Sequence, residues 1–370
     1  MKTQAAVLWN VGEPWSVEEV ELAEPVAGEV RVKLAASGLC HSDEHLVTGD
    51  IPITLPVIGG HEGAGVVEAV GPGVTSVSEG DHVVLSFIPA CGRCHYCSTG
   101  RQNLCDLGAH LLAGLPIADG VPRFTSKGRG IGTMCLLGTF CPYTVVHESS
   151  VVKVDESVPL EVAALVGCGV TTGWGSAVYS AEVHAGETVV VVGTGGVGVN
   201  AVQGARLAGA RHIVAVDPIP FKREQAMAFG ATHAAADMEA AKVLVEQLTW
   251  GQMAEKVILT VGTAGGELVA PMLDLLSKDG RAVVTAIAPI SQMDVKLNLH
   301  LLTLFQKELR GALFGSANPR ADIPKLLSLY RDGQLKLDEL VTRTYTLEDV
   351  NQGYQDLRDG KNVRGLIVYS

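Results

Sequence analysis

The chain carries no excess of positive charge: 28 Lys and Arg residues stand against 40 Asp and Glu, for a formal net charge of −12. Nucleic acids and anionic membrane surfaces attract basic patches, so this balance argues against either as a partner. No apolar run is as long as a membrane span. The first residues, MKTQAAVLWNVGEPW, hold too short an apolar segment for a signal peptide. We therefore expect a cytoplasmic protein.

Cysteine is scarce, with 8 residues in a chain of 370. Thiols stay reduced in the cytosol, so these cysteines are better interpreted as metal ligands or buried thiols than as disulfides. A chain of this length is too long for one ordinary hydrophobic core and predicts two domains. The 47% hydrophobic and 18% charged content is typical of a globular protein.

The first part of the chain predicts a β-rich domain. Residues 3–9 and 29–36 have strand patterns, and in the second Val30, Val32 and Leu34 alternate with polar residues, as in a sheet with one exposed face. Glycine and proline separate these short strands. A compact β-rich domain follows from this pattern.

A group of four cysteines interrupts this part. Cys91, Cys94, Cys97 and Cys105 have the spacing C-x2-C-x2-C-x7-C. Four thiolates in one short loop would close a tetrahedral structural zinc with no open position. An iron–sulfur cluster is the serious alternative, although the last cysteine lacks the following proline of bacterial ferredoxins. We interpret Cys135 and Cys141 as buried thiols.

The part of the chain after about residue 170 predicts a dinucleotide-binding domain. The run ETVVVV (187–192) is typical of a strand buried on both faces of a parallel sheet. It leads into GTGGVG, with Gly193, Gly195 and Gly198, and then into a helical pattern. Asp217 ends the next strand, 19 positions after Gly198. This context is specific for dinucleotide binding, and Asp217 would bind ribose hydroxyls and repel a phosphate, which favours NAD over NADP.

Later segments continue the alternation and predict a doubly wound sheet. We expect helices near 221–230 and 266–277 and strands at 256–261 and 281–287. Helices at 323–333 and 347–360 and a strand at 364–369 would return to the first domain. The expected domains are therefore a catalytic domain (1–169), a dinucleotide-binding Rossmann domain (170–313) and a return to the catalytic domain (314–370), an α/β fold.

Three further residues suggest a second metal site. Cys40 and His61 lie in a glycine-rich stretch, and Cys168 lies far downstream in LVGCGVTTGWG. Each alone is most simply a buried or turn residue. Three widely separated ligands on loops, with a fourth position open to water or substrate, are typical of a catalytic zinc.

Together these motifs resemble the zinc-dependent medium-chain alcohol dehydrogenases, in the long form with two zincs. The segments CHSDEHLVTGD, LSFIPACGRC, GRQNLCDLGA and LVGCGVTTGWGSAVY look most like the nicotinoprotein branch. Those enzymes hold NAD permanently and regenerate it with an external acceptor such as dimethylnitrosoaniline. The resemblance implies a GroES-like catalytic domain beside the Rossmann domain, and two zinc ions and one NAD per chain.

The resemblance also implies roles for individual residues around the catalytic zinc. Cys40, His61 and Cys168 would hold the zinc, and Glu62 behind it could ligate it transiently. Asp43 would orient His61. Ser42 would accept the proton of the alcohol, and His45 would pass it to solvent. The simpler alternative is that Ser42, Asp43 and His45 only bind backbone groups in a turn.

A second set of roles concerns the coenzyme. Thr172 and Val197 would pack around the nicotinamide, Gly196 belongs to the glycine motif, and Lys222 would approach the ribose beside Asp217. His41 and Arg364 would contact the pyrophosphate. Many relatives have Arg at the position of His41, and a neutral His gives a weaker, pH-dependent phosphate contact. Taken alone, Lys222 and Arg364 would be surface charges.

The expected activity is hydride transfer between a primary or secondary alcohol and NAD. An aldehyde–thiol adduct (formaldehyde) dehydrogenase with dissociable NAD is the alternative within the class, and a non-enzymatic zinc module is the alternative outside it. Expected partners are an alcohol or aldehyde substrate and an external redox acceptor. The segment LFQKELRGALFGS (304–316) resembles the segment through which relatives pair, which implies a homodimer or homotetramer, and residues 107–140 would help to form the rim of the substrate pocket.

Overall fold

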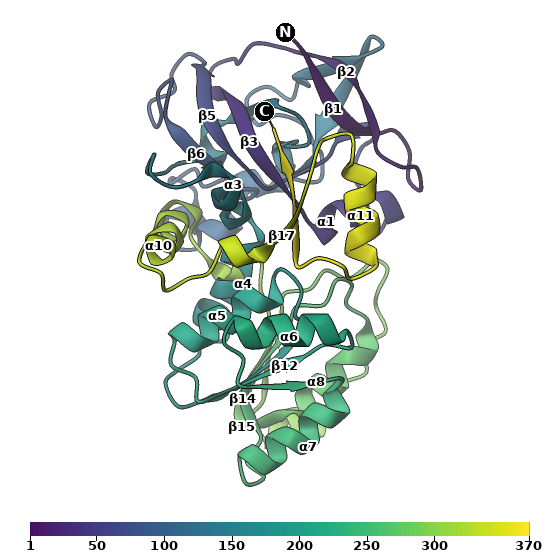
Figure 1. Ribbon diagram of the computed structural model, residues 1–370, viewed down its shortest axis with the longest axis vertical. Coiled ribbons are helices and arrows are strands. Elements are labelled where there is room, and N and C mark those ends of the chain that lie inside the picture. Colours follow the sequence, from purple (N-terminus) through teal and green to yellow (C-terminus); the bar gives the residue numbers. More distant parts are fainter. Residues whose placement is uncertain (370) are drawn as a thin grey trace. The chain divides into compact units, whose positions relative to one another are not determined.

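The computed structural model describes residues 1–369 and divides the chain into two compact units. Unit 1 comprises Met1–Cys168 and the segment from Asn318 onward, and unit 2 comprises Gly169–Ala317. Figure 1 shows both units, coloured along the sequence. The catalytic and coenzyme-binding roles expected for residues 1–169 with 314–370, and for 170–313, stay predictions.

Unit 1 is the β-rich part of the α/β fold, as expected from its alternating strand patterns. One sheet closes as a barrel in the order β1-β2-β7-β8-β4; a second has the order β10-β6-β5-β3-β18-β17, and β9 also pairs with β3. The strands are β1 (Lys2–Leu8), β2 (Ser16–Leu22), β3 (Glu29–Leu39), β4 (Val57–Ile58), β5 (Gly63–Val70), β6 (His82–Leu85), β7 (Phe124–Ser126), β8 (Arg129–Thr133), β9 (Tyr143–His147), β10 (Val151–Lys153), β17 (Val341–Tyr345) and β18 (Arg364–Val368).

The C-terminal segment completes unit 1. Strand β18 runs antiparallel to β3 and pairs Gly365 with Leu39, directly before Cys40. The last part of the chain therefore lies beside the start of α1. The helices of this unit are α1 (His41–Thr48), α2 (His95–Ser98), α3 (Leu160–Ala163), α10 (Pro319–Arg331) and α11 (Val350–Arg358), with short turns at Gln102–Leu104, Asp106–His110, Met134–Leu136, Glu148–Ser150, Ala164–Gly167 and Asp338–Leu340.

Unit 2 contains a parallel sheet in the order β13-β12-β11-β14-β15-β16. This order is that of a Rossmann fold, with β11 as its first strand, and it confirms the doubly wound sheet expected from the sequence. The elements are α4 (Gly169–Gly175), β11 (Thr188–Val192), α5 (Gly198–Leu207), β12 (His212–Val216), α6 (Pro220–Ala228), β13 (His233–Ala235), α7 (Met238–Leu248), β14 (Ala254–Leu259), α8 (Val269–Asp274), β15 (Leu276–Val284), α9 (Leu299–Leu304) and β16 (Glu308–Gly311), with short turns at Ser176–Ser180, Gly266–Leu268 and Phe314–Ser316.

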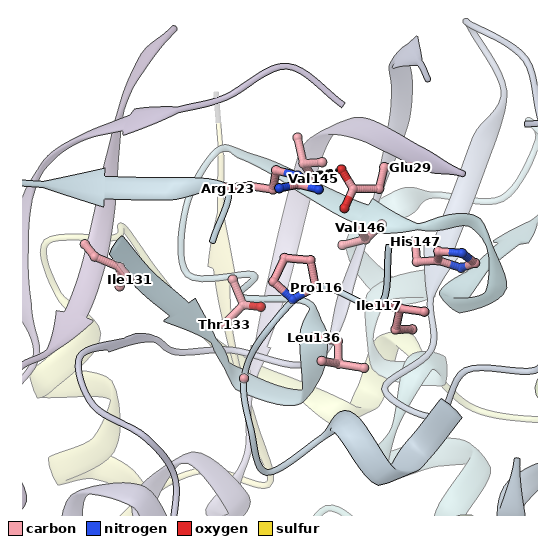
Figure 2. A pocket seen from close by; sticks show the side chains of 11 residues that line it. Glu29, Pro116, Ile117, Arg123, Ile131, Thr133, Leu136, Val145, Val146 and His147 are labelled. Atoms are coloured by element: carbon pink, nitrogen blue, oxygen red, sulfur yellow. Dashed lines mark hydrogen bonds and ion pairs between the residues drawn. The ribbon is translucent and has the colours of Figure 1, made fainter. Parts of the chain in front are cut away.

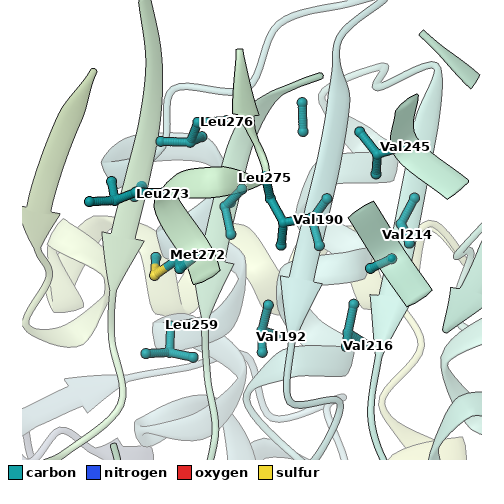
Figure 3. Packing of buried hydrophobic residues seen from close by; sticks show 14 of the residues in the cluster. Val190, Val192, Val214, Val216, Val245, Leu259, Met272, Leu273, Leu275 and Leu276 are labelled. Carbon is teal, nitrogen blue, oxygen red and sulfur yellow. The ribbon is translucent and has the colours of Figure 1, made fainter. Parts of the chain in front are cut away.

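The core of unit 2 explains why its central strand is a continuous β-branched run. Val190 and Val192 of β11 face a cluster that includes Val245 of α7 and Met272 of α8 (Figure 3). The intervening residue Val191 is equally buried on the opposite face. Because both faces of the sheet are covered, the side chains of β11 on either face must be apolar.

Some boundaries differ from the sequence-based expectation. The helix expected at 266–277 ends at Asp274, because Leu276 already pairs with Ala254 of β14 and begins β15. The strands that were not predicted individually are β2, β4, β7, β8, β9, β10, β13, β16 and β17. Within residues 1–369, no single helix is long and apolar enough to cross a membrane; Leu160–Gly167 and Gly169–Ser180 pass that test only as a bent pair.

Candidate metal and coenzyme sites

Four donor side chains converge in unit 1. Cys40 lies between β3 and α1, His61 and Glu62 precede β5, and Cys168 follows the turn Ala164–Gly167. One ligand atom from each lies within 4.8 Å of the others. The structure thus brings together the three loop residues that the sequence pattern selected and Glu62, which the family resemblance implied.

His61 has a free donor position that suits a metal. Its Nδ1 lies 3.0 Å from Oδ2 of Asp43, and Oδ1 of Asp43 accepts a hydrogen bond of 2.8 Å from the N–H of Gly60. The Nε2 atom is buried and has no hydrogen-bond partner. A buried nitrogen without a partner is costly, and a metal ion would satisfy it.

The two thiols of this cluster are electrostatically unequal. A hydrogen bond with Cys168 lowers the pKa of Cys40 well below its ordinary value, although burial opposes this. The same bond, together with burial, raises the pKa of Cys168 well above its ordinary value. The two thiols therefore lie close together in a buried place. A zinc ion would hold both residues as thiolates, so the donor set fits zinc.

Glu62 forms an ion pair with Arg364, which the family resemblance had implied at the pyrophosphate. Burial raises the pKa of Glu62, while the guanidinium of Arg364 opposes the shift. Arg364 is only 3% exposed; it makes a short ion pair with Glu62 and donates to the carbonyl of Leu39 at 3.2 Å. A side chain at Gly38 would collide with the Glu62 carboxylate. The pyrophosphate contact expected of Arg364 stays a prediction.

The residues expected in a proton path lie on α1. The hydroxyl of Ser42 is 3.6 Å from Sγ of Cys40. His45 is buried, and its Nδ1 lies 2.9 Å from Oδ2 of Asp50. Asp50 was not predicted. Hydrogen bonds from Thr48 and His45 lower the pKa of Asp50, so this partly exposed carboxylate is an ionised end point beside His45. The His41 ring lies on the same helix, 6.0 Å from that of His45.

The four-cysteine loop has the geometry of a closed metal site. The sulfur atoms of Cys91, Cys94, Cys97 and Cys105 lie within 4.8 Å of one another. Two of the S···S distances are 3.9 and 4.0 Å, close to the roughly 3.8 Å edge of a tetrahedron with bonds of about 2.3 Å to zinc. Backbone N–H groups of Asp106 and Cys97 lower the pKa of Cys94 to about 7. Burial raises the pKa of Cys97 to about 12, so a bound cation would be needed to hold all four cysteines as thiolates. Cys141 is fully buried as expected, whereas Cys135 is half-buried.

In unit 2 the three glycines of the motif each meet a different constraint. Gly193 has φ +87°, and a Cβ there would lie 2.7 Å from the nitrogen of Val261. A Cβ on Gly198 would lie 1.9 Å from the carbonyl oxygen of Gly193, so only glycine lets α5 approach β11 this closely. Gly195 faces open space, with no atom within 4 Å of its Cβ position. These are the turn, packing and ligand-approach roles of a dinucleotide-binding loop, which fits NAD.

Asp217 closes this loop at the end of β12. Its carboxylate accepts the N–H of Thr194 at 2.9 Å and that of Ile219 at 3.0 Å. Arg223, which was not predicted, donates to the carbonyl of Asp217 at 2.7 Å. Lys222 lies in the first turn of α6, and its carbonyl accepts a bond of 3.4 Å from the Thr194 hydroxyl. Asp217 therefore fixes the loop as well as presenting a carboxylate.

Thr172 lies close to the glycine loop. It belongs to α4, where a Cβ on the next residue, Gly173, would lie 2.1 Å from the carbonyl of Val197. The Thr172 hydroxyl is buried and has no hydrogen-bond partner, as expected of a group reserved for a ligand. The sequence did not reveal the turn Phe314–Ser316 beside it, in which three successive residues have φ between +54° and +60°. Such left-handed residues concentrate at ligand sites.

A separate cavity lies in unit 1, lined partly by the segment 107–140. Figure 2 shows Arg123 and Glu29 side by side at its edge, where they form an ion pair of 2.7 Å. The cavity has a volume of about 10 Å³, room for roughly one water molecule. It is too small for an alcohol substrate, and the role of residues 107–140 at the substrate pocket stays a prediction.

Comparison with known proteins places these sites in a family. Residues 26–156 match the family model "Alcohol dehydrogenase GroES-like domain", and residues 196–332 match "Zinc-binding dehydrogenase". The chain is 55% identical to the NDMA-dependent alcohol dehydrogenase of Amycolatopsis methanolica, over all of both chains. It is also 55% identical to alcohol dehydrogenase B of Mycobacterium tuberculosis, over 100% of this chain and 99% of that one. The benzyl alcohol dehydrogenase of Acinetobacter calcoaceticus superposes with a TM-score of 0.92 at 29% identity, over all of both chains.

The four-cysteine loop gives a prediction for metal content. Substitution of Cys94 by Ser should remove the zinc of this loop, because three thiolates and a hydroxyl bind zinc far more weakly than four thiolates. Atomic absorption of the purified variant should show one zinc per chain fewer than the parent. Cys141→Ala, which removes a thiol outside both donor groups, is the control and should keep the parental content. An unchanged zinc content in Cys94→Ser would refute the assignment.

The glycine motif gives a prediction that separates binding from folding. Gly195→Ala should fold normally but weaken NAD binding at least tenfold, because the new methyl group enters the space reserved for the pyrophosphate. Gly198→Ala should instead lower the melting temperature, because its methyl group meets the Gly193 carbonyl. Calorimetric titration of NAD and thermal unfolding would distinguish the two. Equal effects of both variants on stability would contradict these roles.

Proposed function

The chain belongs to the zinc-dependent medium-chain alcohol dehydrogenases, and from this premise we propose that it is a nicotinoprotein that keeps its NAD bound and passes the electrons to an external acceptor. As a member of the family it is a zinc-binding, NAD-dependent oxidoreductase that acts on small alcohols. The similarity that carries the finer proposal is the 55% identity, over the whole chain, to an alcohol dehydrogenase described as NDMA-dependent. NDMA is dimethylnitrosoaniline, the acceptor expected from the sequence motifs.

The proposed catalytic metal site consists of Cys40, His61 and Cys168, with Glu62 behind them. Zinc supplies Lewis-acid chemistry there, which lowers the pKa of a bound hydroxyl group, to about 7 for water in favourable sites. The protein residues set the conditions for that chemistry. Asp43 holds His61 in one orientation, and Arg364 balances the charge of Glu62, which otherwise would stand ionised in a buried place.

The proton of the alcohol must leave as hydride passes to NAD. In our proposal Ser42 accepts it, because its hydroxyl lies next to Cys40. His45 would carry the proton further. The carboxylate of Asp50, which is partly exposed to solvent, lies at hydrogen-bond distance from His45. A His–carboxylate pair fixes the imidazole tautomer and stabilises its charged form, which is what a relay between a buried hydroxyl and water needs.

The proposed coenzyme site is formed by Gly193, Gly195, Gly196 and Gly198, with Val197 and Thr172 at the nicotinamide and Asp217 and Lys222 at the ribose. One carboxylate oxygen of Asp217 holds the glycine loop at Thr194 and the other holds the turn at Ile219, so the loop is prepared before NAD arrives. Preorganisation of this kind lowers the cost of binding and favours retention. His41 would add a phosphate contact that is weaker than that of an arginine and depends on pH.

The competing proposal within the family is an aldehyde–thiol adduct dehydrogenase with exchangeable NAD. Both alternatives use the same zinc donors, so the metal site does not separate them. They differ in whether NAD leaves after each turnover and in the substrate that is oxidised. A direct test of both properties therefore decides between them.

Purified protein should release NAD on denaturation, about one per chain, and should oxidise simple alcohols with dimethylnitrosoaniline but without added NAD. Chromatography of the denatured extract and loss of acceptor absorbance measure the two quantities. The parent assayed with formaldehyde and a thiol is the comparison. A nucleotide-free extract from an enzyme that needs added NAD would contradict the proposal, and preferential oxidation of the formaldehyde–thiol adduct would establish the alternative.

We also propose that the protein forms a homodimer, alone or within a homotetramer, through the edge of the sheet in unit 2. Strand β16 pairs with β15 on one side. Exposed apolar side chains gather on β16 and the segments that flank it, namely Ile290, Met293, Leu299, Leu304, Leu309 and Leu313. An edge strand beside an exposed apolar patch favours pairing with a second copy.

A charge on this edge should break the dimer. Leu309→Lys should shift the protein to a single-chain mass in sedimentation equilibrium, because the new ammonium group cannot be buried between two strands. Val243→Lys, an equally drastic change at an exposed position on α7, should leave the parental mass unchanged. A parental mass of one chain, or no response to Leu309→Lys, would exclude this interface.

The cytoplasmic location also stays a proposal. All eight cysteines are free thiols in the structure. A reducing compartment would keep them so, which the two metal sites require.

A further inference from the structure

A buried tyrosine hydroxyl from the C-terminal helix reaches the region of the catalytic metal donors. Tyr354 of α11 is 1% exposed, and its hydroxyl donates a hydrogen bond of 3.3 Å to the carbonyl of Cys40. Burial and then the nearby Asp43 carboxylate raise the pKa of this hydroxyl. The hydroxyl therefore bonds the backbone of one metal ligand and lies near the side chain that orients another, His61.

Two aromatic side chains pack against the ring of Tyr354 and fix the position of its hydroxyl. The Trp15 ring lies 6.3 Å away and the Phe140 ring 6.2 Å away, centroid to centroid. The edge of the ring is therefore fixed by packing before the hydroxyl makes any bond. A buried hydroxyl without a partner is costly, so the carbonyl of Cys40 is the acceptor that this hydroxyl requires.

Asp43 is the centre of this arrangement. Its Oδ1 accepts the N–H of Gly60, next to His61, and its Oδ2 faces Nδ1 of His61 at 3.0 Å. The Tyr354 hydroxyl lies beside this carboxylate and holds the Cys40 carbonyl at the start of the same segment. Partners in this position orient a histidine ligand, and their loss typically weakens metal binding 10- to 100-fold.

Helix α11 has a second link to α1. Arg358 lies one turn after Tyr354, and its Nη1 forms an ion pair of 2.6 Å with Glu44, the neighbour of Asp43. Two successive turns of α11 thus hold the segment that carries Cys40 and Asp43. The outer support of the metal donors comes from residues more than 300 positions away in the sequence.

We propose that Tyr354 is a positioning residue of the catalytic zinc site, whose hydroxyl fixes the Cys40 backbone beside the Asp43 carboxylate and so slows the loss of zinc. This inference rests on the proposed zinc site. It concerns the retention and geometry of the metal and assigns Tyr354 no contact with substrate or coenzyme.

The test is the substitution Tyr354→Phe, which removes the hydroxyl and keeps the ring between Trp15 and Phe140. We expect the zinc of the Cys40 site to leave about tenfold faster when the holoenzyme is mixed with a chromogenic chelator, while the four-cysteine loop keeps its zinc. In protein with Co²⁺ in the catalytic site, the visible absorption bands should shift, since they report ligand geometry.

The matched control is Tyr345→Phe. The Tyr345 hydroxyl donates to Asp356 of α11 at 2.9 Å, so its removal loosens the same helix without touching Cys40 or Asp43. We expect parental zinc release and cobalt bands in this variant. An equal acceleration in both variants would show that any loosening of α11 suffices and would overturn a specific role for Tyr354.

Each further outcome is informative. Parental release and spectra in Tyr354→Phe would overturn the inference, and so would a variant that does not fold, because the hydroxyl would then support unit 1 as a whole. The premise is checked separately with Cys168→Ala, which should lose one zinc per chain. If Cys168→Ala keeps the parental zinc content, the proposed catalytic site itself fails.

Discussion

The structure of unit 1 depends on one electrostatic constraint: two thiols, an imidazole and a carboxylate lie buried within 4.8 Å of one another. Such a group cannot be charged freely in a place without water. The ion pair of Glu62 with Arg364 is the balance that the protein residues provide by themselves. A divalent cation would balance the thiolates and coordinate Nε2 of His61.

The glycines next to the four donor side chains leave the space that these side chains occupy. Gly38 lies beside the Glu62 carboxylate, and Gly60 has φ +85° with Phe140 and Thr139 too close for any side chain. The C-terminal segment then closes the group from outside: β18 supplies Arg364, and α11 supplies Tyr354 and Arg358. This explains why the chain leaves unit 2 at Ala317 and returns to complete unit 1.

Much of the fold could be predicted because its signals are local. The β-branched run of β11, the glycine motif and the cysteine spacings are each contained in a few residues, and each corresponds to a structural requirement found in the chain. The pairing of Cys40, His61 and Cys168 needed more, because three separate loops had to be combined. The ligand types suggested that combination, and the resemblance to a family supported it.

What could not be predicted depends on contacts between distant segments. Nothing near Arg364 in the sequence indicates Glu62, and nothing in GYQDLR marks Tyr354 as a neighbour of Cys40. Asp50 lies only five residues after His45, so their contact was easier to anticipate. That contact nevertheless depends on the turn at Gly49, which follows α1. The start of β15 at Leu276 was missed because strand pairing, not local pattern, sets it.

The central claim is that the chain holds two zinc ions in the two donor groups brought together by the fold. X-ray absorption at the zinc edge, with quantified metal, tests it most directly. The account predicts two zinc ions per chain and an average of three sulfur ligands per zinc, the remainder nitrogen and oxygen. One zinc per chain with four sulfur ligands would contradict the account, because the Cys40, His61 and Cys168 group would then not hold the metal.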